Sequence, residues 1–265
     1  MPDPMASPSP ALMPKRTAII PPAARPPGPP HPALYAVDPT ISRRGDPQYV
    51  AWPDTGVLLS IHASPNPPDS HDDYDMPTKF RAHYRKRTRL APRITREIRG
   101  LAFGSGTSAR DFRVSSAAST AYTKLLLGDD ALSPVELTTE DAKQVEKVQA
   151  QLRALPGADQ SPHKHGGEAE IIVLAAKAAA GGGRHVILAN DVGASVVANA
   201  HGLSSRHAAD VIAELSCSDP TLDPNTCLRR FRLGNDVSGI PAACAPTDTT
   251  PFQCVSGGST CALCP

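Results

Sequence analysis

Aromatic side chains, long apolar runs and an excess of charge of either sign are all scarce in this sequence. Phe, Trp and Tyr make up 4% of its 265 residues and 40% are hydrophobic, which predicts a core built mainly from Ala, Val, Leu and Ile. No apolar run approaches the roughly 20 residues of a membrane-spanning helix, so we expect no membrane partner. The 27 basic and 26 acidic residues nearly balance. This balance argues against a polybasic arm or an acidic tail as the whole function, but it leaves room for a local basic patch.

Proline is abundant but unevenly placed. Of the 29 prolines, 14 fall within the first 50 residues, and the stretch 20–30 has no hydrophobic period. Residues 1–45 are therefore predicted to form a disordered, Pro-rich tail, either solvated or bound by a proline-reading domain. Prolines also interrupt the apolar region that a signal peptide would need, so we expect a cytoplasmic protein.

Predicted strands and helices alternate between residues 46 and 215. Val50 to Trp52 fits a short strand that ends at Pro53, which has no N–H to donate, and residues 186–189 fit a buried parallel strand. A polar loop is expected at residues 62–78. Residues 58–61 fit the start of a helix or a continuing apolar element. Helices are expected near residues 93–101, 117–127, 139–155, 171–180 and 194–200, and from a cap at Ser204 or Ser205 to Leu215. This alternation predicts an α/β fold with a mostly parallel sheet flanked by helices.

All six cysteines lie in residues 216–265, where no helical or strand period is evident. We therefore expect a separate small module or an irregular extension. Cys244, Cys254, Cys261 and Cys264 could together hold a structural Zn²⁺. Free thiols or redox pairs, and stable disulfides, are the alternatives.

Four acidic residues are the candidates for chemistry. Asp54 and Asp191 each follow a short apolar strand, and parallel sheets place ligand sites at the carboxyl ends of their strands. Glu168 opens a helix after two glycines, and Glu97 lies on a helix close to an apolar stripe. Carboxylates gathered in one place repel one another, and Mg²⁺ or Mn²⁺ neutralises such a group with its preferred oxygen ligands.

Four segments in this region resemble the motifs of PIN-domain nucleases. They occur in the family's order: Asp54-Thr55-Gly56-Val57-Leu58-Leu59, Ile94-Thr95-Arg96-Glu97-Ile98, Gly167-Glu168-Ala169-Glu170 and Val186-Ile187-Leu188-Ala189-Asn190-Asp191. The third is similar to the Gly-Glu-Ala-Glu box of one subgroup. The resemblance implies a parallel sheet flanked by helices and metal-dependent cleavage of RNA. For a bacterial member it also implies a toxin whose site an antitoxin covers, and we include a homodimer among the expected assemblies.

The resemblance assigns roles to individual residues of this chain. Asp54, Glu97, Glu168 and Asp191 would hold Mg²⁺ or Mn²⁺, with Glu170 as a further ligand or a neighbour of one. The basic run at residues 79–99, in which nine of 21 residues are Lys or Arg, would bind the RNA backbone. The residues assigned to substrate binding are Thr55, Arg85, Lys86, Arg89, Arg96 and Asn190. Two features depart from the family pattern: Pro53 directly before Asp54, and the long insert at residues 62–78.

Each candidate also has an ordinary structural explanation. Glu97 could pair with Arg93 one turn earlier, and Glu168 could simply favour the positive end of its helix. Asp191 could be a helix cap and Asp54 a turn residue, while the basic run could be a solvated face. His163 and His165, before the two glycines, could touch substrate or stay solvated. The alternative functions are accordingly a non-catalytic RNA- or protein-binding module, and a zinc-stabilised interaction protein centred on residues 217–265.

Overall fold

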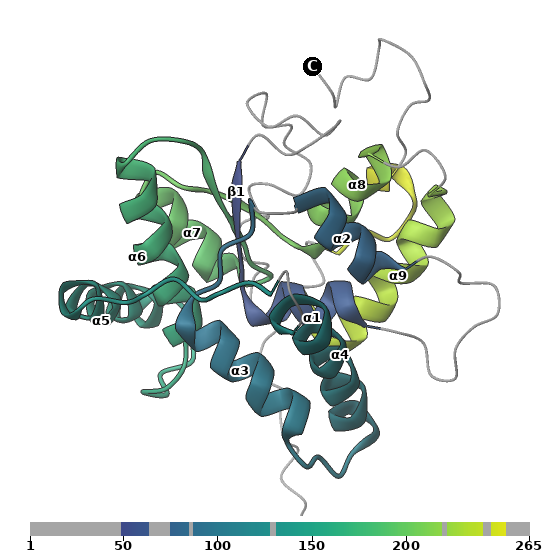
Figure 1. Ribbon diagram of the computed structural model, residues 1–265, viewed down its shortest axis with the longest axis horizontal. Coiled ribbons are helices and arrows are strands. Elements are labelled where there is room, and N and C mark those ends of the chain that lie inside the picture. Colours follow the sequence, from purple (N-terminus) through teal and green to yellow (C-terminus); the bar gives the residue numbers. More distant parts are fainter. Residues whose placement is uncertain are drawn as a thin grey trace, which may run out of the picture.

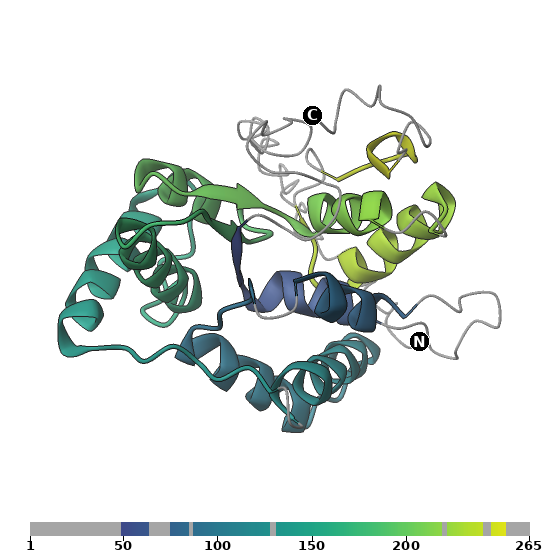
Figure 2. The same ribbon diagram turned by 45° about the horizontal axis from the view of Figure 1, so that its top comes forward.

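The computed structural model describes residues 49–63, 75–84, 87–127, 131–218, 222–240 and 245–252. The predicted tail at residues 1–45 and the candidate zinc ligands Cys244, Cys254, Cys261 and Cys264 lie outside these ranges. The described chain is α/β: helices cover both sides of a parallel sheet (Figures 1 and 2).

The elements follow the chain in a regular order. They are β1 (Val50–Pro53), α1 (Thr55–His62), α2 (Met76–Tyr84), α3 (Pro92–Phe103), α4 (Ala109–Leu126), α5 (Thr139–Ala154), α6 (Gly166–Ala180), β2 (His185–Leu188), α7 (Val192–Ala200), β3 (Ser204–Arg206), α8 (Ala208–Ser218), α9 (Pro224–Val237) and the short 3₁₀ helix η3 (Thr250–Phe252). Figure 1 shows α5, α6 and α7 on one side of β1, with α2, α8 and α9 on the other.

The sheet has three strands in the order β1-β2-β3, and both pairs are parallel. β1 and β2 run in register from Val50 opposite His185 to Pro53 opposite Leu188. Pro53 is the last residue of β1, as predicted, and its missing N–H costs no bond to β2, because Val50 and Asp54 are among the residues whose N–H groups donate to the β2 segment at residues 184–188. The next residue continues the pairing, since the Asp54 N–H donates to the Leu188 carbonyl at 2.8 Å. Pro53 therefore does not disturb the end of the strand.

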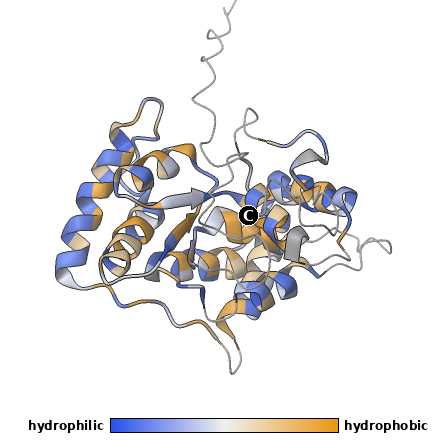
Figure 3. Cartoon of the chain, turned by 90° about the horizontal axis from the view of Figure 1, so that it is seen from above, coloured by the Kyte–Doolittle hydropathy of each residue, from blue (hydrophilic) through white to orange (hydrophobic). Residues whose placement is uncertain are grey.

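The core is mainly aliphatic, as the composition predicts, and it lies between the sheet and the helices. Alanine fills many of its positions, and the largest fully buried side chains include Trp52, Tyr49 and Tyr84. Figure 3 shows the hydrophobic colour gathered on the central elements, whereas α5, at the left edge, is largely hydrophilic. Among the described residues, no helix combines the length and apolar character needed to cross a membrane.

Several predicted helices are present with small shifts in their ends. The clearest case is α5, where Thr138 and Asp141 form a capping box. α4 begins at Ala109 rather than near Ala117, because Ser108 and Asp111 form a second capping box upstream. α2 begins at Met76, inside the segment expected to be a loop.

Two expectations in the last third of the described chain are wrong. Ser204 and Ser205 belong to β3 and cap no helix; α8 begins at Ala208 instead. The segment after residue 216, expected to lack a helical period, contains α9, which Asp223 caps and whose first residue is Pro224. The buried residues of α9 recur at helical spacing: Cys227, Leu228, Arg230, Phe231, Gly234 and Val237.

α9 packs directly on α1 through Gly234. A Cβ at this position would lie 2.4 Å from the Ser60 carbonyl oxygen, closer than any real contact of this kind. The Ser60 hydroxyl also donates to the carbonyl of Ser238, just beyond α9, at 3.1 Å. α9 is therefore part of the same core as α1.

Replacing Gly234 by Ala should force α9 away from α1 and lower the free energy of unfolding by about 1–3 kcal/mol. Gly100 is the matched control because it also lies inside a helix but a Cβ there meets nothing within 4 Å. Gly100→Ala should therefore raise stability, by up to about 1 kcal/mol. Urea unfolding of both variants measures the difference, and equal effects would contradict the close approach of α1 and α9.

Candidate functional site

Two carboxylates lie where β1 and β2 end, and each caps the helix that follows. Asp54 Oδ1 accepts from the Val57 N–H at 2.6 Å at the start of α1. Asp191 Oδ1 accepts from the N–H groups of Gly193 and Ala194, at 2.5 and 3.2 Å, at the start of α7. The capping roles are thus real, and they fix both carboxylates at the carboxyl end of the sheet.

Two glutamates approach the same place from α3 and α6, because Gly166 and Gly167 let these helices come close. A Cβ on Gly167 would lie 3.4 Å from both carboxylate oxygens of Glu97. A Cβ on Gly166 would lie 2.1 Å from Nη1 of Arg93. The glycines before Glu168 therefore allow the start of α6 to pack against α3.

Glu97 is held from two sides. The Thr55 hydroxyl donates to Glu97 Oε2 at 2.6 Å, which links α3 to the start of α1. Arg93 Nε donates to Glu97 Oε1 at 3.2 Å, one turn earlier on the same helix. The ion pair proposed as the ordinary explanation is therefore present, but it coexists with a contact that holds Glu97 against Thr55, the residue after Asp54.

Electrostatic interactions link Asp54, Glu97, Glu168 and Asp191 through Glu168, which interacts with each of the other three; we call these four residues the acidic cluster. Burial raises the pKa of Asp54 well above its usual value, and the charges of Glu168 and Asp191 raise it further, against hydrogen bonds from backbone N–H groups. Burial also raises the pKa of Glu168, with added repulsion from Asp191 and Glu97. Burial first, and repulsion from neighbouring carboxylates second, therefore disfavour the charged forms of Asp54 and Glu168.

A histidine lies close to two of these carboxylates. Ligand atoms of His165, Glu168 and Asp191 all lie within 4.8 Å of one another, so one cation could contact all three, whereas Asp54 and Glu97 do not belong to this close group. Carboxylate oxygens suit Mg²⁺ or Mn²⁺, and an imidazole nitrogen beside them suits a transition cation. The residues present thus fit the metal that the sequence led us to expect.

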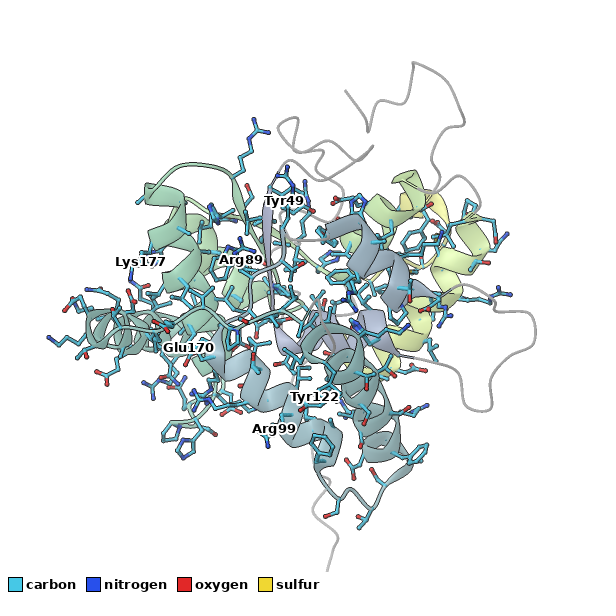
Figure 4. All side chains as sticks on the ribbon, viewed as in Figure 1. Tyr49, Arg89, Arg99, Tyr122, Glu170 and Lys177 are labelled. Carbon is cyan, nitrogen blue, oxygen red and sulfur yellow. The ribbon has the colours of Figure 1, made fainter. Side chains whose placement is uncertain are left out.

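Glu170 does not belong to the acidic cluster. It is buried, and its Oε2 accepts from the backbone N–H of Arg93 at 2.8 Å. Its other oxygen lies 3.6 Å from Arg96 Nη2. Figure 4 shows Glu170 where α6 meets α3. Glu168 and Glu170 therefore face different neighbours, and Glu170 joins two helices.

The residues assigned to substrate binding do not all reach the cluster. Asn190 is buried, where its amide donates to Ser60 Oγ and the Ser238 carbonyl and accepts from the Ala208 N–H, so it holds the fold together. Arg89 pairs through its N–H with the Ala51 carbonyl and influences His185 at the beginning of β2, far along the strand from its acidic end.

The remaining assigned residues divide in two. Thr55 is bonded to Glu97, and Arg96 precedes Glu97 on α3 with a side chain that is 72% exposed. Thr55 therefore contacts the acidic cluster, whereas Arg96 lies against Glu170, outside it. Arg85 and Lys86 lie outside the described residues.

The sequence alone did not predict the role of Arg93 in joining three segments of the site. Its backbone N–H binds Glu170, its Nε binds Glu97, and its Nη2 donates to the His163 carbonyl at 2.6 Å. One side chain thus ties α3 to the loop before α6. The only local signal was its spacing of four residues from Glu97; the contact with His163 depends on the fold.

Replacing Asp54 by Asn should stabilise the metal-free protein at neutral pH, by about 1–3 kcal/mol, because Asn keeps the cap and removes a buried, repelled charge. Burial raises the pKa of Asp54 in the folded state. The charged Asp54 carboxylate therefore lowers the free energy of unfolding most at pH values above that folded pKa. The advantage of the variant should therefore shrink as the pH falls toward about 4.

Thermal unfolding in EDTA across this pH range measures the effect. Asp223→Asn is the control, because Asp223 also caps a helix but is exposed, and hydrogen bonds from Thr226 and Asn225 lower its pKa. That variant should lose stability slightly at neutral pH. A loss of stability in Asp54→Asn would contradict the repulsive cluster.

Comparison with known proteins adds no relative. No family model, no curated protein and no solved structure matches the chain significantly.

Proposed function

We propose that the protein is a PIN-like, metal-dependent nuclease that hydrolyses RNA phosphodiester bonds. The observation that carries this proposal is the acidic cluster at the carboxyl end of a parallel sheet, in which Glu168 and Asp191 lie close enough to share a cation and Asp54 and Glu97 interact electrostatically with Glu168. A structural role alone does not account for this convergence, because bringing four carboxylates together raises the free energy of the fold. Their order along the chain agrees with the PIN-domain motifs.

The chain's own residues would prepare the site by holding the carboxylates still. The helix caps fix Asp54 and Asp191, and Thr55 with Arg93 fixes Glu97. A divalent cation bound there would supply a more acidic water and stabilise the charge that develops on the phosphate. Because the ligands are held in place before substrate arrives, little reorganisation is needed at the moment of reaction.

Basic residues next to the cluster would hold the RNA backbone. Arg96 and Arg99 are exposed on α3, on the helix that carries Glu97, and Figure 4 shows Arg99 further along that helix. Positive charge beside a carboxylate site attracts a polyanion that the carboxylates alone would repel. The choice of RNA, and the expectation of a covering antitoxin protein, come from the PIN resemblance.

Cleavage of a structured RNA by the purified full chain tests the proposal. We expect cleavage with Mn²⁺ or Mg²⁺ and none with EDTA. Asp54→Asn and Asp191→Asn should each reduce the rate at least about 100-fold, because both carboxylates would hold the cation. Glu146→Gln is the control: it removes an exposed carboxylate on α5 and should leave the rate unchanged.

Folded protein that binds RNA but cleaves none with either metal would overturn the nuclease proposal. It would favour the non-catalytic binding module instead. Asp54→Asn would then leave the RNA affinity as it was, with no cleavage to lose.

A second pair of variants separates the two neighbouring glutamates. Glu168→Gln should abolish cleavage, because Glu168 lies in the acidic cluster. Glu170→Gln should retain most of the rate, because the amide oxygen can still accept from the Arg93 N–H. Single-turnover rates at saturating Mn²⁺ make the comparison. The reverse order of effects would show that α6 presents its other face to the cation.

A further inference from the structure

We infer that His165 is a nitrogen ligand of the cation in the acidic cluster, and that its imidazole makes the site favour a first-row transition cation such as Mn²⁺ over Mg²⁺. The inference rests on the metal site of the proposed function and adds a ligand that the PIN-domain motifs do not supply.

The backbone of His165 is the first observation. Among the described residues, it alone combines a side chain with a positive φ, at 61°. It occupies the N-cap position of α6. The N-cap residues of α1, α5 and α7, in contrast, have an extended backbone. A left-handed backbone at a residue other than glycine costs free energy and is retained where the surroundings enforce it, often at functional sites.

The surroundings that enforce it are visible on both sides. Arg93 Nη2 binds the carbonyl of His163, two residues earlier, and the Arg93 guanidinium lies against Gly166, the next residue. The His165 carbonyl itself accepts from the Ala169 N–H at 3.0 Å in the first turn of α6. Arg93, which also binds Glu97, therefore contacts residues on both sides of His165 and holds its conformation.

The side chain of His165 is the second observation. Asp54, Thr138 and Asp191 use their side chains to cap their helices, but His165 makes no side-chain capping bond. Its Nε2 is shielded from solvent and, within the described chain, has no hydrogen-bond partner. Buried polar atoms almost always have a partner, so this nitrogen calls for one.

The third observation is where the imidazole lies. One of its ring nitrogens is within 4.8 Å of carboxylate oxygens of both Glu168 and Asp191. A cation at ordinary bond lengths of roughly 2.0–2.3 Å fits between ligand atoms at such separations. The left-handed backbone, the uncommitted side chain and this location thus agree on one role.

The imidazole determines which cation is favoured. Mg²⁺ prefers oxygen ligands and keeps several waters, whereas transition cations accept imidazole nitrogen readily. A site built from carboxylates alone would discriminate weakly between Mg²⁺ and Mn²⁺. One nitrogen ligand should tip the preference toward Mn²⁺.

Electron spin echo spectroscopy of Mn²⁺ bound to the full chain tests the assignment directly, because it detects ¹⁴N bonded to the metal. The wild type should show the imidazole modulation, and His165→Asn should lose it. Asn is chosen because it tolerates the left-handed backbone, so the loop should keep its conformation. His163→Asn is the matched control: it removes an exposed imidazole two residues away and should keep the modulation.

Calorimetric titration supplies the second readout. His165→Asn should weaken Mn²⁺ binding about 10-fold or more and change Mg²⁺ binding less than about twofold. A wild type without ¹⁴N modulation, modulation that persists in His165→Asn, or equal losses for both cations would each overturn the assignment.

The two proposals fail separately. If Mn²⁺ is bound through nitrogen but the protein cleaves no RNA, His165 is confirmed as a ligand and the nuclease proposal is overturned. If the protein cleaves RNA with Mn²⁺ but shows no nitrogen signal, the nuclease proposal stands and the assignment of His165 as a ligand is overturned.

Discussion

The parallel pairing of β1 with β2 is the constraint on which the site depends. Because Pro53 lies opposite Leu188, the chain leaves both strands at the same edge, and the Asp54 N–H completes the pairing. α1, α6 and α7 begin near this edge, each close to one of the acidic residues or His165. Their positive N-terminal ends offset part of the repulsion among the carboxylates. The strands thus position the acids, and the helices make their proximity tolerable.

Structural and functional explanations of the acidic residues are not exclusive in this fold. Asp191 is a helix cap, Asp54 is another, and Glu97 forms an ion pair with Arg93. Each bond restricts where the carboxylate can lie, and a cation site needs ligands whose positions are already restricted. The ordinary contacts are therefore the means by which the acidic cluster keeps its geometry.

Features encoded by neighbouring residues could be predicted from the sequence. The end of β1 at Pro53, the cap at Thr138 and the different faces of Glu168 and Glu170 all follow from local spacing or backbone chemistry. Features that arise from contacts distant in sequence could not. The position of Asn190 after a strand suggested a substrate contact, but its amide bonds to Ser60, Ser238 and Ala208, which are distant in sequence. Likewise, residues 204–206 form a strand because they pair with β2.

The position of α9 has a consequence for where this folding unit can be cut. A chain ended at Leu215 would lose Ser238, which accepts from Asn190, and Phe231 and Phe252, which are buried and in ring contact. The Ser216 hydroxyl also donates to the Phe252 carbonyl at 3.2 Å. The smallest independently stable fragment should therefore reach at least Phe252. Deletions meant to test the cysteines after Phe252 must begin beyond that residue. A deletion that begins earlier would remove contacts that support the acidic cluster, and its effect would be one of unfolding.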